Sequence, residues 1–440
     1  MVTDLREGQT QRGRVRPRPV VERDTLGQVL ELIRRNQAFT RQEIEQLSGL
    51  GRATVADRLT SLSQIGLVEE GALGVSTGGR APRHIQFKSS AGHVLIATVG
   101  TTTIGVGLTD LDGRLLVEHH EPGDVSAGPA QTLDRIGTLF EWILAEHARG
   151  RPIWGIGLGM PGPVEHVDGR FGAAARLRRT TGWDGVAVTD HFRQRYDVPT
   201  WMDSEAHLSA LGELRLGHGV GRRDLLYLKI GSEISVGVCA DGRVLRGARG
   251  YAGEVGHVAA SDQSKVTCRC GNTGCLVALA GGAAIARDGT LAAHRGESPY
   301  LARLLGAGGE LSAADVSVGA ARGDARSIEI LSRAGRLIGA SLATLINAYN
   351  PSLVVVGGGV AQAGDVLLSA IRESVYRHSR SVAVQDIQIA RSELGKAAGL
   401  VGAAVAVADE LFAPDSFRSW VDYGSPVAAH RSGALMVTAA

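Results

Sequence analysis

The sequence has 440 residues, of which 44% are hydrophobic and 21% charged, with a net charge of +2. This length and apolar content allow a large buried core in two or three domains and exclude an intrinsically disordered chain. No apolar run approaches the roughly 18 residues that a membrane span needs, and no apolar stretch follows the arginines of the first twenty residues, as a secretory signal would require. We therefore expect a cytoplasmic protein without a membrane partner.

The charge is unevenly distributed along the chain. Residues 1–88 contain 14 Lys and Arg against 10 Asp and Glu, whereas the remainder is slightly acidic. A mildly basic N-terminal portion indicates an anionic partner for that portion. Residues 1–22 are rich in Arg, Pro, Gly and Gln without periodicity, and they are predicted to be a flexible basic arm.

Three amphipathic helices are predicted after this arm, because apolar side chains recur there at helical spacing. These side chains are Leu26, Val29, Leu30, Ile33, Ile44, Leu47, Val55, Leu59, Leu62 and Ile65. Thr40 and Glu43 have the spacing of a capping box at the start of the second helix. Two strands at residues 67–69 and 85–87 follow, joined by a glycine-rich tip at 76–80.

Three helices followed by a β-hairpin predict a winged helix-turn-helix over residues 23–88. In that plan the helix after the turn inserts its first residues into the major groove, and the hairpin tip reaches phosphates or the minor groove. The predicted DNA contacts are therefore Gly51, Arg52, Ala53, Thr54, Arg58, Gly79, Arg80 and Arg83. A small protein-interaction domain is the alternative interpretation of the same pattern.

The large remainder of the chain contains an internal repeat. Residues 93–109 and 225–245 each predict a strand, a glycine-containing turn and a second strand, and an Asp-Gly hairpin signal accompanies each copy. Two copies of one unit predict two related α/β lobes that face a cleft. In phosphotransferases of that build, such glycine-rich turns hold nucleotide phosphates.

One histidine and three closely spaced cysteines form the strongest chemical signal in the sequence. They are His257, Cys268, Cys270 and Cys275. One imidazole and three thiolates are the four ligands that a tetrahedral structural zinc takes, and in a cytosolic chain such crowding favours a metal over disulfides. Reduced thiols without a metal are the alternative. Cys239 alternates within a predicted strand and is expected in the core.

With these motifs, residues 24–410 resemble the ROK family of repressors, uncharacterised reading frames and sugar kinases, in its transcriptional-regulator branch. The resemblance rests on the winged helix, the cysteine loop, and the segments 155–163, 254–257 and 354–359. It implies an actin-like, two-lobed kinase fold over residues 92–412, with one structural zinc ion per chain held by His257 and the three cysteines. It also implies that Glu254 and His257 contact sugar hydroxyls, and it leaves residues 413–440 as a C-terminal tail.

The chain departs from the family's kinases at three places. The first turn, Thr98–Thr103, lacks the acidic residue of the kinases, and Glu233 puts a carboxylate where phosphates should approach. Ser204-Glu205-Ala206-His207 replaces Asn-Asp-Ala-Asn, so the residue at the position of the general base, Glu205, is one methylene longer. We therefore predict no catalytic residue and no enzymatic activity.

The combined prediction is an α/β transcriptional regulator that binds operator DNA as a homodimer or homotetramer. Its degenerate kinase-like domain would sense a sugar or a related metabolite through Ser204, Glu205, Glu254 and His257. Two alternatives stay open: an ATP-dependent sugar kinase with an added DNA-binding module, and a ligand-independent regulator that uses the large domain only as a dimerisation scaffold. Val277, where the kinases usually have another sugar-contacting glutamate, leaves the identity of the effector open.

Overall fold

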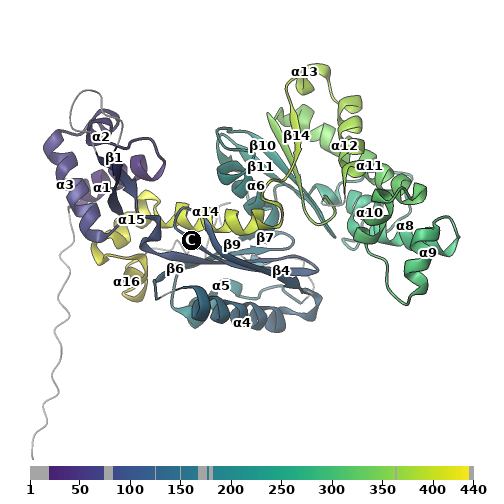
Figure 1. Ribbon diagram of the computed structural model, residues 1–440, viewed down its shortest axis with the longest axis horizontal. Coiled ribbons are helices and arrows are strands. Elements are labelled where there is room, and N and C mark those ends of the chain that lie inside the picture. The colour runs from purple at the N-terminus through teal and green to yellow at the C-terminus, as the bar shows by residue number, and fades with distance from the viewer. Residues whose placement is uncertain are drawn as a thin grey trace, which may run out of the picture. The chain divides into compact units, whose positions relative to one another are not determined.

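The chain forms two compact units in the computed structural model (Figure 1). The residues described are 19–73, 83–123, 125–148, 150–166, 176–177, 182–361 and 364–435. The smaller unit comprises Met1–Ala91 together with Glu410–Met436, and the larger one comprises Gly92–Asp409 with the last four residues.

The smaller unit begins with the predicted winged helix-turn-helix. Its elements are α1 (Val20–Arg34), α2 (Arg41–Ser48), α3 (Arg52–Ile65), β1 (Val68–Leu73) and β2 (Arg83–Phe87), with the two strands antiparallel. Thr40 and Glu43 form the expected capping box, and Gly49 ends α2 in the left-handed conformation at φ 69°. The predicted apolar side chains are buried in the core, except that Ile65 is half-buried and Leu47 is exposed. Gly79 and Arg80, at the predicted hairpin tip, lie outside the described residues.

Two boundaries of the prediction are wrong. Helix α1 begins at Val20, so the last residues assigned to the basic arm are helical. The segment assigned to a C-terminal tail contains α15 (Pro414–Trp420) and α16 (Pro426–Arg431). Aromatic side chains explain this second difference: Phe417 and Trp420 are buried, and the Trp420 indole donates a hydrogen bond to the carbonyl of Leu411 at 2.7 Å.

The C-terminal helices complete the core of the winged helix-turn-helix. Phe412 packs edge-on against Phe87 of β2, with ring centroids 5.4 Å apart, and against Trp420 at 5.8 Å. Arg23 of α1 donates a hydrogen bond to the carbonyl of Arg418 at 3.0 Å. The smaller unit is therefore assembled from both ends of the chain.

The described part of the larger unit contains two five-stranded sheets of matching topology. The first has the order β5-β4-β3-β6-β9 and the second β12-β11-β10-β13-β14; in each, three consecutive antiparallel strands continue into two parallel ones. This confirms the repeat predicted from the sequence. The strands are β3 (His93–Val99), β4 (Thr103–Asp110), β5 (Leu115–Pro122), β6 (Ile153–Met160), β9 (Thr200–Ser204), β10 (Leu225–Ile230), β11 (Ile234–Ala240), β12 (Arg243–Val244), β13 (Leu353–Gly357) and β14 (Gln388–Arg391), with a separate short pair β7 (Val164–Glu165) and β8 (Arg176–Leu177).

Helices cover both sheets of the larger unit. Helices α4 (Pro129–His147) and α5 (Val188–Tyr196) lie along the first sheet (Figure 1). Helices α6 (Glu205–Leu216) and α14 (Ala398–Leu411) pack against each other. The second lobe carries α7 (Leu276–Ala280), α8 (Gly282–His294), α9 (Pro299–Gly306), α10 (Ala313–Ala321), α11 (Ala325–Tyr349), α12 (Asp365–His378) and α13 (Ser381–Val384). Cys239 is fully buried in β11, as predicted.

Among the described residues, one helical stretch is long and apolar enough to cross a membrane. It is Leu276–His294, which joins α7 and α8, and a second stretch qualifies only if Gly395–Leu411 and Pro414–Tyr423 are joined across a sharp bend. Half of the apolar window of Leu276–His294 is buried, and Leu276 and Ile285 belong to the core of the second lobe. Core helices pass the same test, so this stretch is weak evidence for a membrane span.

Replacement of Trp420 tests the structural role of the C-terminal segment. Trp420→Ala should lower the free energy of unfolding of the smaller unit by about 3–5 kcal/mol, because it empties a fully buried aromatic site. Chemical denaturation followed by circular dichroism measures this change. Trp142→Ala, at an indole that is 41% exposed on α4, is the control and should have a much smaller effect. Equal effects of the two substitutions would contradict the assignment.

Candidate functional site

The first turn of α3 projects from the smaller unit. Val55 and Leu59 anchor one face of the helix in the core, so Arg52 and Ala53 are exposed and Thr54 is half-buried. Gly51, the N-cap, supplies no side-chain hydrogen bond, which leaves the first N–H groups of the helix open to an anion. Within the described part of the chain, Arg52 makes no ion pair, so its guanidinium is available to a partner.

Two other predicted DNA contacts are engaged within the smaller unit. Arg58 does not face outward: its Nε donates to the Thr25 hydroxyl of α1 at 2.8 Å, and its guanidinium pairs with Asp57 at 2.5 Å. The prediction for Arg58 is therefore corrected, because helical spacing alone did not show which side chain turns towards α1. Arg83 is exposed at the start of β2 and pairs with Glu70 at 2.8 Å.

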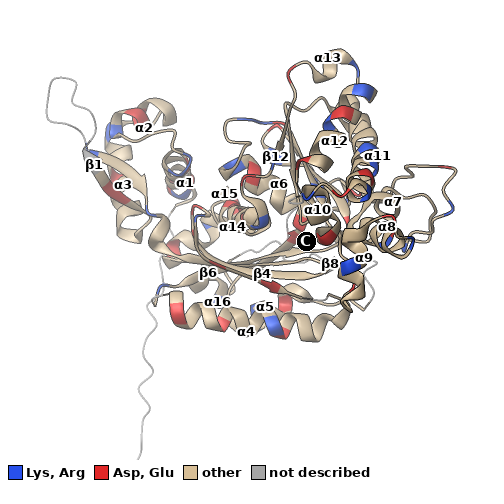
Figure 2. Cartoon of the chain, turned by 45° about the vertical axis from the view of Figure 1, so that its right-hand side comes forward, with Lys and Arg blue, Asp and Glu red and all other residues tan. Residues whose placement is uncertain are grey.

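The described surface of the winged helix-turn-helix carries charges of both signs (Figure 2). The described residues between 19 and 91 include eight Lys and Arg and eight Asp and Glu, so their charges balance. The basic surplus of residues 1–88 therefore comes from residues outside the described ranges. Recognition by the described part depends on where single arginines lie, rather than on an overall positive field.

The larger unit encloses a cavity of about 1390 Å³ between its two lobes. The turn after β3, the N-terminus of α6, the turn after β10 and the 3-10 turn Val255–His257 all reach it. The structure brings all four residues predicted for the ligand to this cavity: Ser204, Glu205, Glu254 and His257. The two glycine-containing turns of the internal repeat also line it, on opposite sides.

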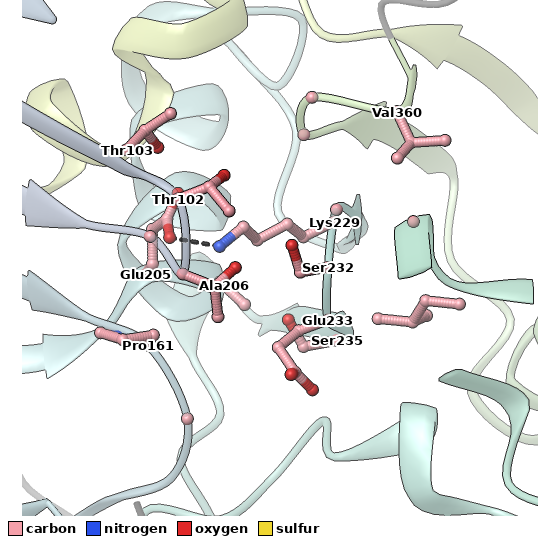
Figure 3. Close-up of a pocket in the computed structure, with 18 of the residues that line it drawn as sticks. Thr102, Thr103, Pro161, Glu205, Ala206, Lys229, Ser232, Glu233, Ser235 and Val360 are labelled. Atoms are coloured by element: carbon pink, nitrogen blue, oxygen red, sulfur yellow. Dashed lines mark hydrogen bonds and ion pairs between the residues drawn. The ribbon is translucent and has the colours of Figure 1, made fainter. Parts of the chain in front are cut away.

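Glu205 is ion-paired inside the cavity, a contact that sequence reasoning missed. Its carboxylate bonds to the ammonium of Lys229, which reaches across from β10 (Figure 3). Both side chains are largely buried, at 21% and 15% exposure. The only sequence signal was a lysine in an otherwise apolar strand, Leu225–Ile230. The carboxylate of Glu205 is therefore engaged by a side chain of the protein itself.

Glu233 is also paired, with a partner from the cysteine loop. Its carboxylate bonds to the guanidinium of Arg269, and its other oxygen lies 4.0 Å from Nε2 of His257. Glu233 follows the turn that would approach nucleotide phosphates in a kinase. The cysteine loop therefore reaches this turn through Arg269, which the sequence analysis did not single out.

Glu254 differs from these two carboxylates. Among the described residues no side chain donates a hydrogen bond to it. Burial raises the pKa of its carboxyl, and the positive charges of His257 and His207 only partly oppose this effect. A largely buried carboxylate without a partner on a cavity wall can accept hydrogen bonds from a bound ligand.

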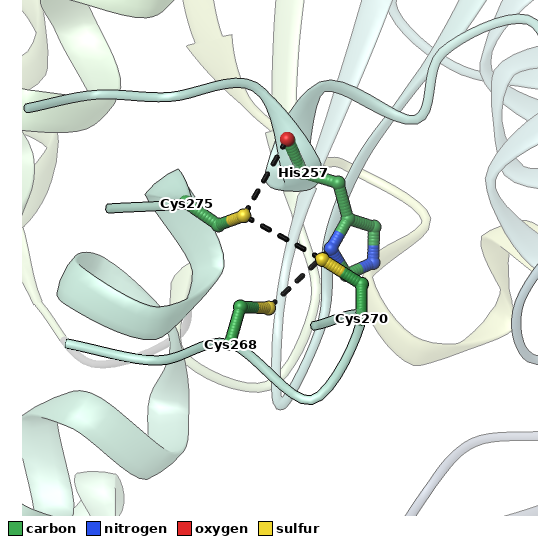
Figure 4. Close-up of side chains that lie close together, drawn as sticks. All are labelled: His257, Cys268, Cys270 and Cys275. Atoms are coloured by element: carbon green, nitrogen blue, oxygen red, sulfur yellow. Dashed lines mark hydrogen bonds between the residues drawn. The ribbon is translucent and has the colours of Figure 1, made fainter. Parts of the chain in front are cut away.

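The four predicted metal ligands come together next to the cavity (Figure 4). Their ligand atoms all lie within 4.8 Å of one another, and the cysteines form no disulfide. Nδ1 of His257 is 3.5 Å from Sγ of Cys268, and Sγ of Cys270 is 3.7 Å from Sγ of Cys275. A tetrahedral zinc with Zn–S bonds of about 2.3 Å separates its sulfur ligands by about 3.8 Å. The donor set and its spacing therefore fit such an ion.

Residues 96–410 match the ROK family. The chain belongs to the ROK family. It is 30% identical over 305 residues to a glucokinase from Halalkalibacterium halodurans, covering 69% of this chain and 91% of the relative. It is 28% identical over 390 residues to a xylose repressor from Caldicellulosiruptor bescii, covering 88% of this chain and 96% of the relative.

Solved structures of this ROK family agree with the fold. A ROK transcriptional regulator, a homolog of the Escherichia coli MLC protein, superposes with a TM-score of 0.72 over 95% of this chain and 100% of that one, at 23% identity. A ROK glucokinase from Streptomyces griseus, in complex with glucose and AMPPNP, gives a TM-score of 0.62 over 71% of this chain and 98% of that one, at 28% identity. These likenesses support the predicted winged helix and actin-like, two-lobed domain.

A double-mutant cycle tests the ion pair between Glu205 and Lys229. Lys229→Met should lower the free energy of unfolding by about 1–3 kcal/mol, because it leaves a largely buried carboxylate unpaired. Adding Glu205→Gln should recover most of this loss. Arg223→Met is the control, since its pair with Asp241 is exposed and should contribute less than about 1 kcal/mol. Additive losses from the two substitutions would show that the side chains do not interact in solution.

Proposed function

We propose that this protein is a ligand-responsive, DNA-binding transcriptional regulator whose kinase-like domain senses a sugar or a related small metabolite. The proposal rests on two features that occur in the same chain. One is the exposed first turn of the predicted recognition helix, Gly51–Thr54. The other is a ROK cavity in which Glu205 is ion-paired with Lys229. Two xylose repressors and the E. coli regulator NagC match over 85% or more of this chain, whereas the match to a glucokinase covers 69% of it.

Three features of the cavity support a binding rather than a catalytic role. Glu205 is held by Lys229, so it is poorly suited to accept a proton from a sugar hydroxyl. Glu233, ion-paired with Arg269, places a carboxylate beside the turn that would approach phosphates. Thr98 replaces the acidic residue of the kinase turn. An ATP-dependent sugar kinase is the second candidate, because glucokinases are among the relatives. ATP-dependent phosphorylation of glucose or xylose by the pure protein would favour it.

For the effector we propose a neutral polyhydroxylated molecule. Glu254 supplies an unpartnered acceptor, His257 presents Nε2 towards the cavity, and the Glu205–Lys229 pair places an acceptor beside a donor, as adjacent hydroxyl groups require. A ligand bound between the lobes would change DNA affinity only if it binds two conformations of the protein with different affinities. The coupling free energy between ligand and DNA binding is typically about 1–3 kcal/mol. A scaffold without any effector is the remaining alternative.

The metal proposed for the Cys3His cluster is a single structural zinc ion. Zinc would hold the cysteine loop and orient the imidazole of His257, whose other nitrogen is directed towards Glu233 at the cavity. We further propose a cytoplasmic protein that binds a palindromic or repeated operator as a homodimer or homotetramer, because one winged helix contacts too little DNA for high selectivity.

Arg52 carries the first test of DNA recognition. Arg52→Ala should weaken binding to DNA fragments selected by the wild-type protein from a random pool by about 1–3 kcal/mol, if the guanidinium contacts a guanine edge. Fluorescence anisotropy at several salt concentrations measures the loss. Arg377→Ala, at an exposed arginine of α12 in the larger unit, is the matched control. Unchanged affinity of the Arg52 variant would refute the recognition turn.

Glu254 carries the test of ligand sensing. Titration of the DNA complex with glucose, xylose and N-acetylglucosamine should reveal a sugar that changes DNA affinity. Glu254→Gln, which keeps shape but removes the acceptor charge, should abolish this response and leave sugar-free DNA binding near normal. Equal responses of wild type and variant would place the effector site elsewhere, and no response to any metabolite tried would favour the scaffold alternative.

Elemental analysis tests the metal. The purified protein should contain about one zinc ion per chain, and Cys270→Ser should lower metal affinity and thermal stability because binding energy contributes to folding. Cys239→Ser, at a buried cysteine outside the cluster, is the control for loss of a thiol alone. A fully folded wild-type protein free of metal would contradict the proposal.

A further inference from the structure

A buried polar cluster lies beneath the cavity, centred on Asp203 at the end of β9. The Asp203 side chain is fully buried. Its Oδ1 lies 3.0 Å from Nε2 of His166, 2.9 Å from Nδ1 of His207 and 2.7 Å from the backbone nitrogen of Ser204, and its Oδ2 is 2.7 Å from Nε of Arg246. Four donors occupy the carboxylate, so Asp203 has no capacity left for a ligand.

The neighbouring side chains keep the Asp203 carboxyl ionised. Burial by itself would raise its pKa, but the charges of Arg246 and His207 and the hydrogen bonds from His166 and His207 outweigh burial and hold the pKa well below its usual range. Asp203 is therefore a carboxylate and can only accept hydrogen bonds.

The imidazole of His207 lies between two hydrogen-bond acceptors. Nδ1 faces the Asp203 carboxylate, and Nε2 is 3.0 Å from the backbone carbonyl oxygen of Ala252. A neutral imidazole has a single N–H donor, whereas a carboxylate and a backbone carbonyl offer none. Both bonds form together only in an imidazolium, whose two ring nitrogens each carry a proton. The His207 side chain is 1% exposed.

His207 connects the first lobe to the segment that ends at Glu254. The segment spans residues 246–254 and is held at several points. Side chains hold it through Arg246 on Asp203, Arg249 on Glu165, and His207 on the carbonyl of Ala252. Backbone nitrogens hold two further carbonyls: that of His166 bonds to Arg249 at 3.1 Å, and that of Val236 bonds to Gly253 at 2.9 Å. Ala252 lies two residues before Glu254 and itself lines the cavity.

We propose that His207, held as an imidazolium by Asp203, is a positioning residue that fixes segment 246–254 and thereby places Glu254 on the cavity wall. The role of this placement in ligand sensing rests on the proposed function. The positioning of segment 246–254 by His207 does not depend on that function. Of these anchors, the hydrogen bond to Ala252 is the one that depends on the extra proton of His207. Its loss should therefore loosen this segment without unfolding the unit.

The first experiment needs only the wild-type protein. Long-range ¹H–¹⁵N correlation spectra at pH 7 report the protonation of each imidazole, and His207→Gln assigns the signal among the 13 histidines. The expected result is a doubly protonated ring for His207. A neutral ring at pH 7 would overturn the proposal, whatever the variant does.

The second experiment measures the consequence for the segment, without ligand or DNA. In His207→Gln, hydrogen exchange of amides in residues 246–257 should accelerate by roughly ten- to a hundredfold, while the strands of both sheets and the zinc content stay as in wild type. His294→Gln, at an exposed histidine ending α8, is the matched control and should leave exchange unchanged. Unchanged exchange in residues 246–257, or acceleration spread evenly over the unit, would overturn the positioning role. Because neither readout involves an effector, failure of the proposed sensing function leaves these results interpretable.

Discussion

The close packing of α6 on α14 is the constraint on which the larger unit depends. A methyl group at Gly402 of α14 would overlap the carbonyl oxygen of Leu208, and one at Gly212 of α6 would overlap that of Ala398. Glycines also let α6 approach β11 at Gly237 and α14 approach β6 at Gly157. The two helices thus join the sheets of both lobes through backbone contacts, a geometry that only residues without a Cβ allow. This packing places the N-terminus of α6, with Glu205 and His207, between the lobes.

The functional character of the cavity depends on which of its carboxylates have partners. Glu205 and Glu233 form ion pairs with Lys229 and Arg269, whereas no side chain of the described residues donates a hydrogen bond to Glu254. At two positions where the chain departs from the family's kinases, the cavity has carboxylates that are ion-paired with basic side chains. The same lobes can still close on a ligand, because the fold supports binding independently of chemistry.

Both ends of the chain contribute to the DNA-binding unit. Helix α14 begins at the cavity, where Gly399 lines the wall, and its last residues, Glu410 and Leu411, belong to the smaller unit. The aromatic side chains that follow are buried against the winged helix-turn-helix. A single helix therefore has one end in each unit, so the C-terminal segment is as much a part of the DNA-binding unit as the first helices are.

Local patterns in the sequence were sufficient for the elements and for the metal cluster. Helical spacing, the Thr40 capping box and the turn at Gly49 determine the helix-turn-helix, because these signals act between residues a few positions apart. His257 and the cysteines could be predicted as metal ligands because one imidazole and three closely spaced thiols form the ligand set of a structural zinc site. Tertiary structure decided the rest: that Arg58 bonds to Thr25 of α1, that Lys229 pairs with Glu205, and that His207 lies between Asp203 and the carbonyl of Ala252. These partners lie on different elements, so their contacts depend on how sheets and helices pack, which no local spacing in the sequence records.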